Sequence, residues 1–194
     1  MPTEKENMLS GKPFKAFDKE LSNERAYARE LVFDFNNFRP GEYAAKNELL
    51  KKLIGSTPKS FYIEQPFYCD YGYNIEIGNK FYANTNLTIL DCAKVIIGSN
   101  VFIGPNVGIY TVSHPIHHEP RNQFFEQAKP ITIGNNVWIG GSVVINPGIT
   151  IGNNSVIGSG SVVTKDIPSG VIAAGNPCKI LREVTEEDKA RFSR

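Results

Sequence analysis

An aliphatic residue recurs at every sixth position through the second half of the chain, and this period constrains the fold more than any other feature. The residue after each aliphatic position is small or polar, and we expect it at a tight corner where Gly or Asn tolerates backbone angles that other residues resist. A period of six fits neither a single helix nor a single strand, which repeat near 3.6 and 2. It is typical of a parallel β-helix, in which short strands and sharp corners stack turn upon turn. The frame consists of Ile133, Ile139, Ile145, Ile151, Ile157 and Val163, followed by Gly134, Gly140, Asn146, Gly152, Gly158 and Thr164.

The same frame extends backwards, with two departures. It includes Ile97, Ile103 and Ile109 and, after a shift of two residues, Ile77, Ala83 and Ile89. The shift places about two extra residues near Asp91 to Lys94. Residues 111–130 have no six-residue pattern, although the frame is in phase on both sides of them. A long irregular segment inside a strict repeat predicts an excursion from the coil with a function of its own.

Residues 1–58 are of a different kind and predict a helical segment. Ser22 is a plausible N-cap for a helix from Glu24 to about Asn37. A second helix is expected from about residue 42 to 54, with Gly55 as its C-terminal cap. Apolar residues on one face of each helix would cover the open end of the coil and hide its unpaired strand edges. We assign residues 59–184 to the β-helix, with the loop 111–130 protruding, and 185–194 to a tail.

Composition excludes several classes of protein. The chain has 194 residues with 21 basic and 20 acidic side chains, so nothing indicates a nucleic-acid or anionic membrane partner. No apolar run approaches the roughly 20 residues of a membrane span, and the polar N-terminus does not resemble a signal peptide. The three cysteines, Cys69, Cys92 and Cys178, are widely spaced and lack a CxxC pair, which favours reduced thiols and a cytoplasmic location.

All three histidines lie in the excursion, at positions 114, 117 and 118. Histidine is the usual general base near neutral pH, and a sugar or alcohol hydroxyl needs a base as it attacks. His114, between Ser113 and Pro115, is the candidate, and an ordinary surface histidine is the alternative. A zinc site on a β-helix needs ligands from separate coils, so this clustering within one loop does not support a metal.

Motifs along nearly the whole chain, from about residue 5 to 184, resemble one enzyme family. They include MLSGKPF near the start, CDYGYNI at 69–75, FYANTNLTILD at 81–91, TVSHPIHHEPR at 111–121, ITIGNNVWIGG at 131–141 and the ending GSVVTKDIPSGVIAAGNPCKILR. In this order they resemble the maltose/galactoside O-acetyltransferases, a family of hexapeptide-repeat acyltransferases, and most closely its maltose members.

The resemblance implies transfer of an acetyl group from acetyl-CoA to a sugar hydroxyl, with a primary 6-hydroxyl expected, in a homotrimer with sites between subunits. It implies a left-handed parallel β-helix, an exception to the usual right-handed crossover. The hydroxyl would attack the thioester directly in a ternary complex, so neither a cysteine nucleophile nor a metal is required.

By the same resemblance, His114 is the general base and Asn84 binds the acceptor and helps to stabilise the transition state. Taken alone, without the resemblance, Asn84 is better explained as a corner residue comfortable at unusual backbone angles. A backbone N–H near Trp138 to Gly141, Gly141 by the match, would stabilise the oxyanion. Trp138 would wall the pantetheine channel or cover a subunit interface. The implied coenzyme A contacts are Gly141, Ser159, Thr164, Lys165, Lys179 and Arg182, the last two being a basic pair suited to phosphate groups.

The acceptor contacts match the family less completely. Asp70 falls on a substrate-contacting position, within a CDYGYN motif that resembles the maltose enzymes. Two aspartates of the galactoside enzymes fall on Ala16 and Cys92, where Asp18 and Asp91 are the expected substitutes. Glucose or maltose is therefore a better expectation than a galactoside.

Three alternatives remain open at this stage. The first is a hexapeptide acetyltransferase that acts on serine or an antibiotic, which the N-terminal segment disfavours. The second is a β-helix carbonic anhydrase, which the clustering of the histidines disfavours. The third is a non-catalytic scaffold, which the histidine-bearing loop disfavours.

Overall fold

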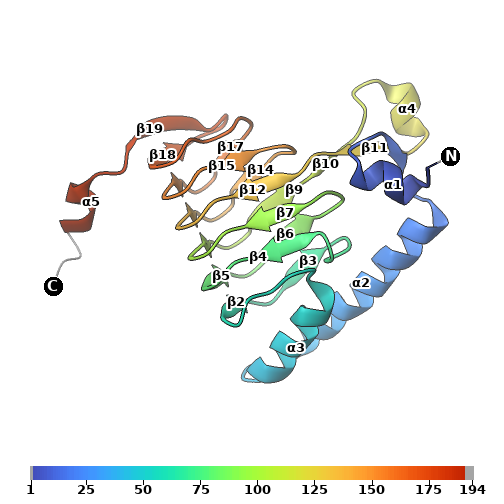
Figure 1. Ribbon diagram of the computed structural model, residues 1–194, viewed down its shortest axis with the longest axis horizontal. Helices are drawn as coiled ribbons and strands as arrows, with labels where there is room; N and C mark the ends of the chain where they lie inside the picture. Colours follow the sequence, from blue (N-terminus) through green and yellow to red (C-terminus); the bar gives the residue numbers. More distant parts are fainter. Residues whose placement is uncertain (1, 191–194) are drawn as a thin grey trace.

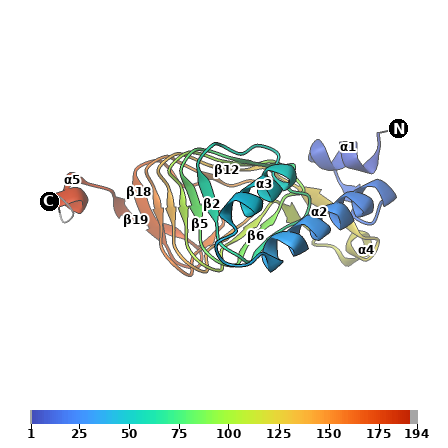
Figure 2. The same ribbon diagram turned by 90° about the horizontal axis from the view of Figure 1, so that it is seen from below.

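Residues 2–190, which the computed structural model describes, are organised around a parallel β-helix whose coils stack along the long axis of the molecule (Figures 1 and 2). The strands of successive coils form three sheets. The first sheet contains β4 (Ile75–Ile77), β7 (Val95–Ile97), β12 (Ile131–Ile133) and β15 (Thr150–Ile151). The second contains β2 (Phe61–Ile63), β5 (Phe81–Ala83), β8 (Phe102–Ile103), β13 (Trp138–Ile139), β16 (Val156–Ile157), β18 (Val171–Ala174) and β19 (Lys179–Glu183). The third contains β3 (Phe67–Cys69), β6 (Leu87–Leu90), β9 (Gly108–Tyr110), β14 (Val144–Ile145) and β17 (Val162–Val163).

The chain passes through the three sheets in order, so each coil has three corners, which we name for what they contain. The glycine corner joins the first and second sheets and consists of residues 78–80, 98–100, 134–136 and 152–154. The Asn84 corner joins the second and third sheets and consists of residues 84–86, 104–106, 140–142 and 158–160. The loop corner joins the third sheet back to the first and consists of residues 70–74, 91–94, 111–130 and 146–149.

The six-residue frame stacks as predicted. Ile133 pairs with Ile97 on one side and Ile151 on the other, and Ile139 lies in the same way between Ile103 and Ile157. The frame residues are almost wholly buried and form one continuous core along the coil.

Glycine is required after the aliphatic positions for a different physical reason from the one expected. Gly98 does not adopt a left-handed conformation; a Cβ added to it would lie 2.7 Å from the carbonyl carbon of Gly134 in the next coil. Glycine is needed there because successive coils approach closely. The left-handed residues come two positions later, as at Asn100, Asn136 and Asn154.

The insertions into the regular coil lie at the loop corner, whereas the last coil, from β16 to β18, is two residues shorter. Strand partners in the regular part are 18 residues apart, as for Ile133 and Ile151, whereas Ile77 and Ile97 are 20 apart. The two extra residues near Asp91 to Lys94 are confirmed, and the same widening occurs one coil earlier, at residues 70–74. The earlier one was missed because no hexapeptide frame precedes it. The excursion leaves from the same corner, one coil further on.

The N-terminal helices cover the open end of the coil, as expected (Figure 1). They are α2 (Lys19–Asn37) and α3 (Tyr43–Leu53), and Val32, Phe35 and Leu50 join the core of the first strands. The predicted N-cap Ser22 is wrong: Asp18 caps α2, because its Oδ1 accepts hydrogen bonds from the backbone N–H groups of residues 20 and 21. Gly55 is not a left-handed cap either, since a Cβ there would lie 2.2 Å from the Tyr73 carbonyl oxygen.

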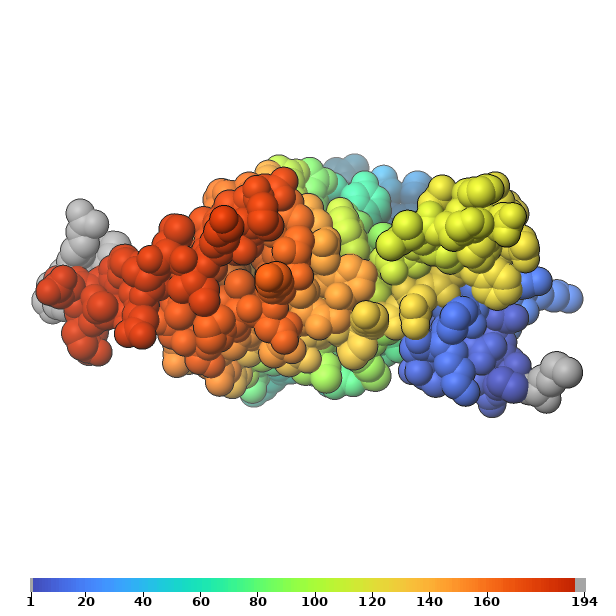
Figure 3. All heavy atoms as spheres, turned by 90° about the horizontal axis from the view of Figure 1, so that it is seen from above, coloured from blue at the N-terminus to red at the C-terminus, as the bar shows by residue number. Residues whose placement is uncertain are grey.

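The excursion is structured and is fastened to the start of the chain. It contains β10 (Val112–Ser113), α4 (His118–Asn122) and β11 (Phe125–Ala128), and β11 pairs with both β10 and β1 (Phe14–Lys15). Figure 3 shows the N-terminal segment beside this loop at one end of the molecule. A second core lies beneath them, formed by Met8 of α1 (Glu4–Leu9) with Phe14, Ala16, Leu21, Tyr71, Cys92, Ala93 and Ala128.

The other end of the coil finishes in an antiparallel hairpin, β18–β19, followed by α5 (Glu186–Ala190). None of the helices within residues 2–190 is long and apolar enough to cross a membrane.

Candidate active site

Asp91 organises the turn at the loop corner rather than facing solvent. Its side chain is fully buried. Its Oδ1 accepts hydrogen bonds from the backbone N–H groups of Asp70 (3.0 Å) and Tyr71 (2.9 Å), and its Oδ2 accepts one from Asn74 (3.4 Å). Burial raises the pKa of Asp91 to about 6, although the backbone donors oppose this. The predicted contact between Asp91 and an acceptor is therefore corrected: both its oxygens serve the turn that carries Asp70.

Asp70 is the partly buried carboxylate of this corner. Burial raises its pKa, while the positive charges of Arg25 and Arg29 oppose the shift. The Cys92 thiol donates a weak hydrogen bond to Asp70 Oδ2 at 3.8 Å. Burial also raises the pKa of Cys92 far above its ordinary value, which favours the protonated thiol.

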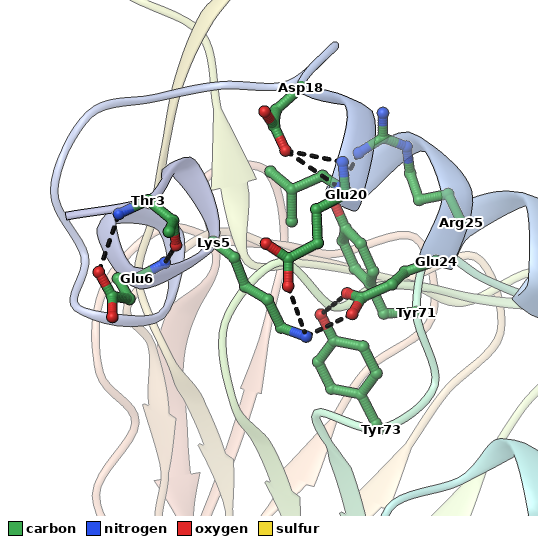
Figure 4. Close-up of polar contacts among 10 residues, drawn as sticks. Thr3, Lys5, Glu6, Asp18, Glu20, Glu24, Arg25, Tyr71 and Tyr73 are labelled. Atoms are coloured by element: carbon green, nitrogen blue, oxygen red, sulfur yellow. Dashed lines mark hydrogen bonds and ion pairs between the residues drawn. The ribbon is translucent and has the colours of Figure 1, made fainter. Parts of the chain in front are cut away.

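Arg25 of α2 ties three segments together at this corner (Figure 4). Its guanidinium donates to the Tyr71 hydroxyl and to the Ala16 carbonyl oxygen. Beside it, the Tyr73 hydroxyl donates to Glu24 Oε2 at 2.8 Å, and Lys5 of α1 pairs with the same carboxylate. The N-terminal segment is thus fixed over residues 70–74 by charge-assisted hydrogen bonds.

His114 follows β10 and lines a hollow of about 420 Å³ at the base of the excursion. Its Nε2 lies 3.7 Å from Glu126 Oε1, and the imidazole is 59% exposed whereas the Glu126 side chain is only 18% exposed. Burial raises the pKa of Glu126, and the nearby His114 opposes this. The hollow is lined by Pro13, Ser113, His114, Pro115, Pro120, Phe125, Glu126 and Gln127. An accessible imidazole beside a half-buried carboxylate suits general-base chemistry.

The two substitutions at the expected acceptor positions lie together. Ala16 and Cys92 are both buried in the second core, in contact with its apolar side chains. Asp18, the expected substitute for the missing carboxylate at position 16, is partly buried and caps the N-terminus of α2 through Oδ1. Its Oδ1 is therefore committed to the helix, and only Oδ2 is available to a ligand.

Asn84 lies at a different corner. It follows β5, and its side-chain Oδ1 accepts a hydrogen bond from the backbone N–H of Thr85 at 2.8 Å. Gly141 and Ser159 occupy the same corner two and three coils further on; the Gly141 carbonyl accepts from Gly160 N–H at 2.9 Å. The Gly141 N–H is not a donor in any backbone hydrogen bond among the described residues, as an oxyanion donor requires.

A row of outward-facing residues leads along the second sheet to the C-terminal cations. Register pairs place Trp138 beside Val156, Val156 beside Ile172, and Ile172 beside Arg182. Trp138 is 56% exposed. Arg182 makes two 2.7 Å contacts with the carboxylate of Asp188, which hold the pKa of Asp188 below its usual range. Lys179 lies on the same strand, and Thr164 and Lys165 are exposed after β17.

The structure therefore gathers the predicted site residues into two groups. His114 and Asp70 lie at the loop corner, whereas Asn84, Gly141 and Ser159 lie at the Asn84 corner. The third sheet separates these two corners. Between His114 and Asn84 in the described chain there is neither a hydrogen bond nor an ion pair.

Sequence reasoning missed Arg25 and Glu126. Arg25 lies on a helix with many charged residues, and nothing local distinguishes it. Glu126 could have been found from the sequence. A search for a carboxylate to pair with the predicted base leaves only Glu119 and Glu126 within residues 111–130.

Comparison with known proteins agrees with this architecture. Residues 7–58 match the maltose acetyltransferase hexapeptide capping motif, residues 130–165 match the bacterial transferase hexapeptide repeats, and residues 94–116 match the hexapeptide repeat of succinyl-transferase. A helix-capped coil of such repeats defines the hexapeptide-repeat transferases as a class.

The relatives are more specific. The chain is 48% identical to the galactoside O-acetyltransferase of Escherichia coli, over 95% of this chain and 91% of that protein. The crystal structure of a maltose O-acetyltransferase from Clostridium difficile superimposes with a TM-score of 0.94 at 50% identity, covering 95% of this chain and 98% of that one. The structure of a galactoside acetyltransferase in complex with coenzyme A superimposes with a TM-score of 0.95 at 47% identity, covering 100% of this chain and 96% of that one. The chain belongs to this family of maltose and galactoside O-acetyltransferases, and the expected left-handed parallel β-helix with a helical N-terminal segment and one loop excursion is confirmed as its fold class.

Metal ligands do not gather in the described part of the chain, residues 2–190, where no group of three or more His, Cys, Asp or Glu could hold an ion.

Proposed function

We propose that this enzyme transfers the acetyl group of acetyl-CoA to a hydroxyl of a small sugar, with His114 as the general base. The observation that carries the proposal is the pairing of His114 with Glu126 in an open hollow, on a loop that leaves an otherwise regular coil. Similarity to enzymes named for galactoside and maltose acetylation, one of them bound to coenzyme A, supports the donor and the acceptor class.

The reaction follows from these groups. The sugar hydroxyl gives its proton to the free imidazole nitrogen of His114 as its oxygen attacks the thioester carbonyl carbon. Glu126 stabilises the imidazolium that forms. The Gly141 N–H donates to the developing oxyanion. When the carbon–sulfur bond breaks, the departing thiolate takes the proton from His114, and every proton is accounted for without an acyl-enzyme.

The acceptor would lie against the loop corner, where Asp70 and Glu126 offer hydrogen-bond acceptors. A sugar hydroxyl is both a donor and an acceptor, so a carboxylate-lined corner suits a polyol better than an amino acid, whose own carboxylate would be repelled. We retain glucose or maltose, acetylated at the 6-hydroxyl, as the expected acceptor. Ala16 and Cys92 provide no charged group where the galactoside enzymes have aspartates.

The donor side chains fit an extended, amphipathic molecule. The row from Trp138 through Val156 and Ile172 is apolar and suits the pantetheine arm, and it ends at Arg182, whose guanidinium suits a phosphate group. Gly141 and Ser159, at the corner beside this row, and Thr164, Lys165 and Lys179 complete the proposed donor contacts.

The separation of the two corners is an argument for a shared site. His114 and Asn84 lie on opposite edges of the third sheet, so one chain cannot present both to one substrate. In a symmetric trimer the loop corner of one subunit can face the Asn84 corner of the next. The second sheet also exposes an aromatic row, in which the rings of Tyr62 and Tyr82 stack at 5.9 Å and Phe102 is 52% exposed. Such a face is typical of a contact between subunits.

The first test is release of coenzyme A from acetyl-CoA with glucose, maltose, a galactoside, serine and chloramphenicol as acceptors. We expect sugar-dependent turnover that falls about 10²–10⁴-fold in His114→Ala. His118→Ala is the matched control, because His118 lies in the same loop and its ring contact among the described residues is with His117. Turnover that is unchanged in His114→Ala, or greatest with serine or chloramphenicol, would contradict the proposal.

Mixed oligomers test the shared site. His114→Ala and Asn84→Ala chains are each expected to be nearly inactive, but co-refolded together they should recover activity at about a quarter of the sites of a symmetric trimer. The wild type subjected to the same refolding is the control. If activity is not recovered, both residues act in a site that belongs to a single chain, and the shared site is contradicted.

A further inference from the structure

We propose that Phe17 and Phe124 form an aromatic platform beside the active-site hollow that binds the second sugar ring of a glycoside acceptor. The inference rests on the proposed function and deepens it, because it predicts a preference for a disaccharide over a single hexose. It concerns two residues that the reaction itself does not use.

The two rings form a defined pair on the surface. Their centroids are 4.9 Å apart and their planes meet at 85°, an edge-to-face arrangement. Phe17 is 71% exposed and Phe124 is 57% exposed. The backbone holds the pair in place, because Ala16 N–H donates to the Phe124 carbonyl oxygen at 3.3 Å, next to the β1–β11 pairing. The rings are thus presented on a ribbon rather than on loose chain.

Phe124 is held in a conformation that does not favour phenylalanine. Its φ is +62°, in the left-handed region that glycine adopts without strain and bulky residues rarely occupy. An exposed ring gains little from burial in the folded chain, so folding does not explain the choice of this side chain. Strain of this kind, held in place by the surrounding structure, is typical of ligand sites.

Polar groups surround the rings in a hollow of about 360 Å³. It is lined by Glu4, Lys15, Phe17, Asp18, Gln123 and Phe124. Asp18 Oδ1 and Glu4 Oε2 are committed to backbone N–H groups, whereas their second oxygens accept no hydrogen bond from the described residues. A pyranose ring has one face of C–H groups that packs on an aromatic ring, and hydroxyls at its edge that bond to carboxylates and amides. A second copy of the chain would instead require a larger and more apolar surface.

Residues that line the platform and residues that line the hollow of His114 are neighbours in the sequence and in the β1–β11 pairing. Lys15 lines the hollow of Phe17 and Phe124, and its Nζ lies 5.5 Å from the centre of the Phe125 ring, which lines the hollow of His114. Phe124 and Glu126 are two residues apart, at most about 7 Å between Cα atoms. One hexose at His114 can therefore place the next hexose of the same molecule on the platform.

The experiment compares glucose with maltose as acceptors for the wild type, Phe124→Gly and Phe17→Ala. Glycine suits the backbone at 124, so the first variant loses the ring without losing stability. In both variants we expect kcat/KM for maltose to fall about five- to tenfold, mostly through KM, while kcat/KM for glucose stays within about twofold. Phe33→Ala, which removes a similarly exposed ring of α2 outside this hollow, is the control.

Equal losses for glucose and maltose, or no loss for either, would overturn the platform. Saturation transfer from protein to maltose, measured by NMR without acetyl-CoA, separates this inference from the proposed function. If the wild type acetylates no sugar but contacts maltose, and both variants lose that contact, the proposed function fails and the platform stands. If the wild type acetylates maltose and both variants are unaffected, the platform fails and the proposed function stands.

Discussion

The regular stack, residues 131–163, and the loop corner use the same three sheets but bury different chemistry. In the stack, each coil takes 18 residues and its core consists of Ile and Val, with Ser155 and Ser161 as its only buried polar side chains among the described residues. At the loop corner, coils are longer by two residues or more, and Asp91, Asn74 and Thr111 are buried. Strict repetition leaves no room for a titratable group, so carboxylates and histidines enter the molecule where the repeat is broken.

The largest expected effect tests the stack. Ile139 is completely buried between two coils, and Ile139→Ala should lower the free energy of unfolding by about 3 kcal/mol through lost burial and a cavity. Urea unfolding at a fixed protein concentration measures it. Ile96→Ala, on the outward face of the first sheet, should lower it by less than about 1 kcal/mol. Equal effects would mean that the repeat's core does not carry the stability.

The next effect tests the buried carboxylate of the loop corner. Asp91→Ala removes the acceptor of three buried backbone N–H groups and should lower the free energy of unfolding at pH 7 by about 1–3 kcal/mol. It should also raise KM for the sugar, because the turn that carries Asp70 loses its support.

The contribution of Asp91 to the free energy of unfolding depends on pH with a definite sign, which comparison with the neutral isostere Asn measures. The pKa of Asp91 in the folded chain is about 6, above the value of about 3.9 in an unfolded chain. Its contribution to stability is therefore greatest below about pH 4 and is lost as pH rises through 6. The stability of the wild type relative to Asp91→Asn should decrease from pH 4 to pH 7, measured by urea unfolding of both proteins. A flat difference would show that burial does not shift this carboxylate.

A smaller effect concerns the carboxylate beside His114. Glu126→Gln keeps the size of the side chain but removes the charge that stabilises the imidazolium, so we expect kcat to fall about tenfold, or about 1.4 kcal/mol. Glu119→Gln is the matched control, because Glu119 lies in the same loop, 4.0 Å from His117. If both variants lose activity equally, the pairing with His114 is not the reason.

The smallest effect returns to the surface of the stack. Asn136 bonds to Asn100 at 3.1 Å and to Asn154 at 2.9 Å, in a ladder at the glycine corner, with φ of +57°. Asn136→Gly should lower the free energy of unfolding by less than about 1 kcal/mol, because these bonds are exposed. Asn136→Ala adds left-handed strain of about 1 kcal/mol. Differential unfolding of the two variants measures that strain, and identical values would contradict it.

The regular stack could be predicted from the sequence more completely than the N-terminal segment. Residues 131–163 could be placed strand by strand, because each coil depends only on its neighbours. The start of α2 could not: Asp18 and Ser22 are both good caps, and the pairing of β1 with β11, over a hundred residues away, accompanies the choice of Asp18.

The candidate site also has features that the sequence predicts and features that it does not. His114 could be chosen from its loop and its chemistry, and the structure places it beside Glu126 in an open hollow. The burial of Asp91 could not be foreseen, because the two extra residues of the preceding coil curl around its carboxylate only in three dimensions. The separation of Asn84 from His114 likewise depends on which corner each occupies, which the period of six does not specify.

The number of coils also fixes the distance between the excursion and the C-terminal cations. From β8, in the coil that carries the excursion, the second sheet proceeds through β13 and β16 to β18, beside which β19 carries Arg182. Three strand spacings of about 4.8 Å make this interval about 14 Å, and every spacing is fixed by backbone hydrogen bonds. The stack is therefore a rigid spacer between the excursion and the terminal cations, adjustable only in whole coils. Deleting 18 residues would keep the frame intact yet bring the two ends about 4.8 Å closer, so a donor bound as proposed, which has a fixed length, would no longer reach both.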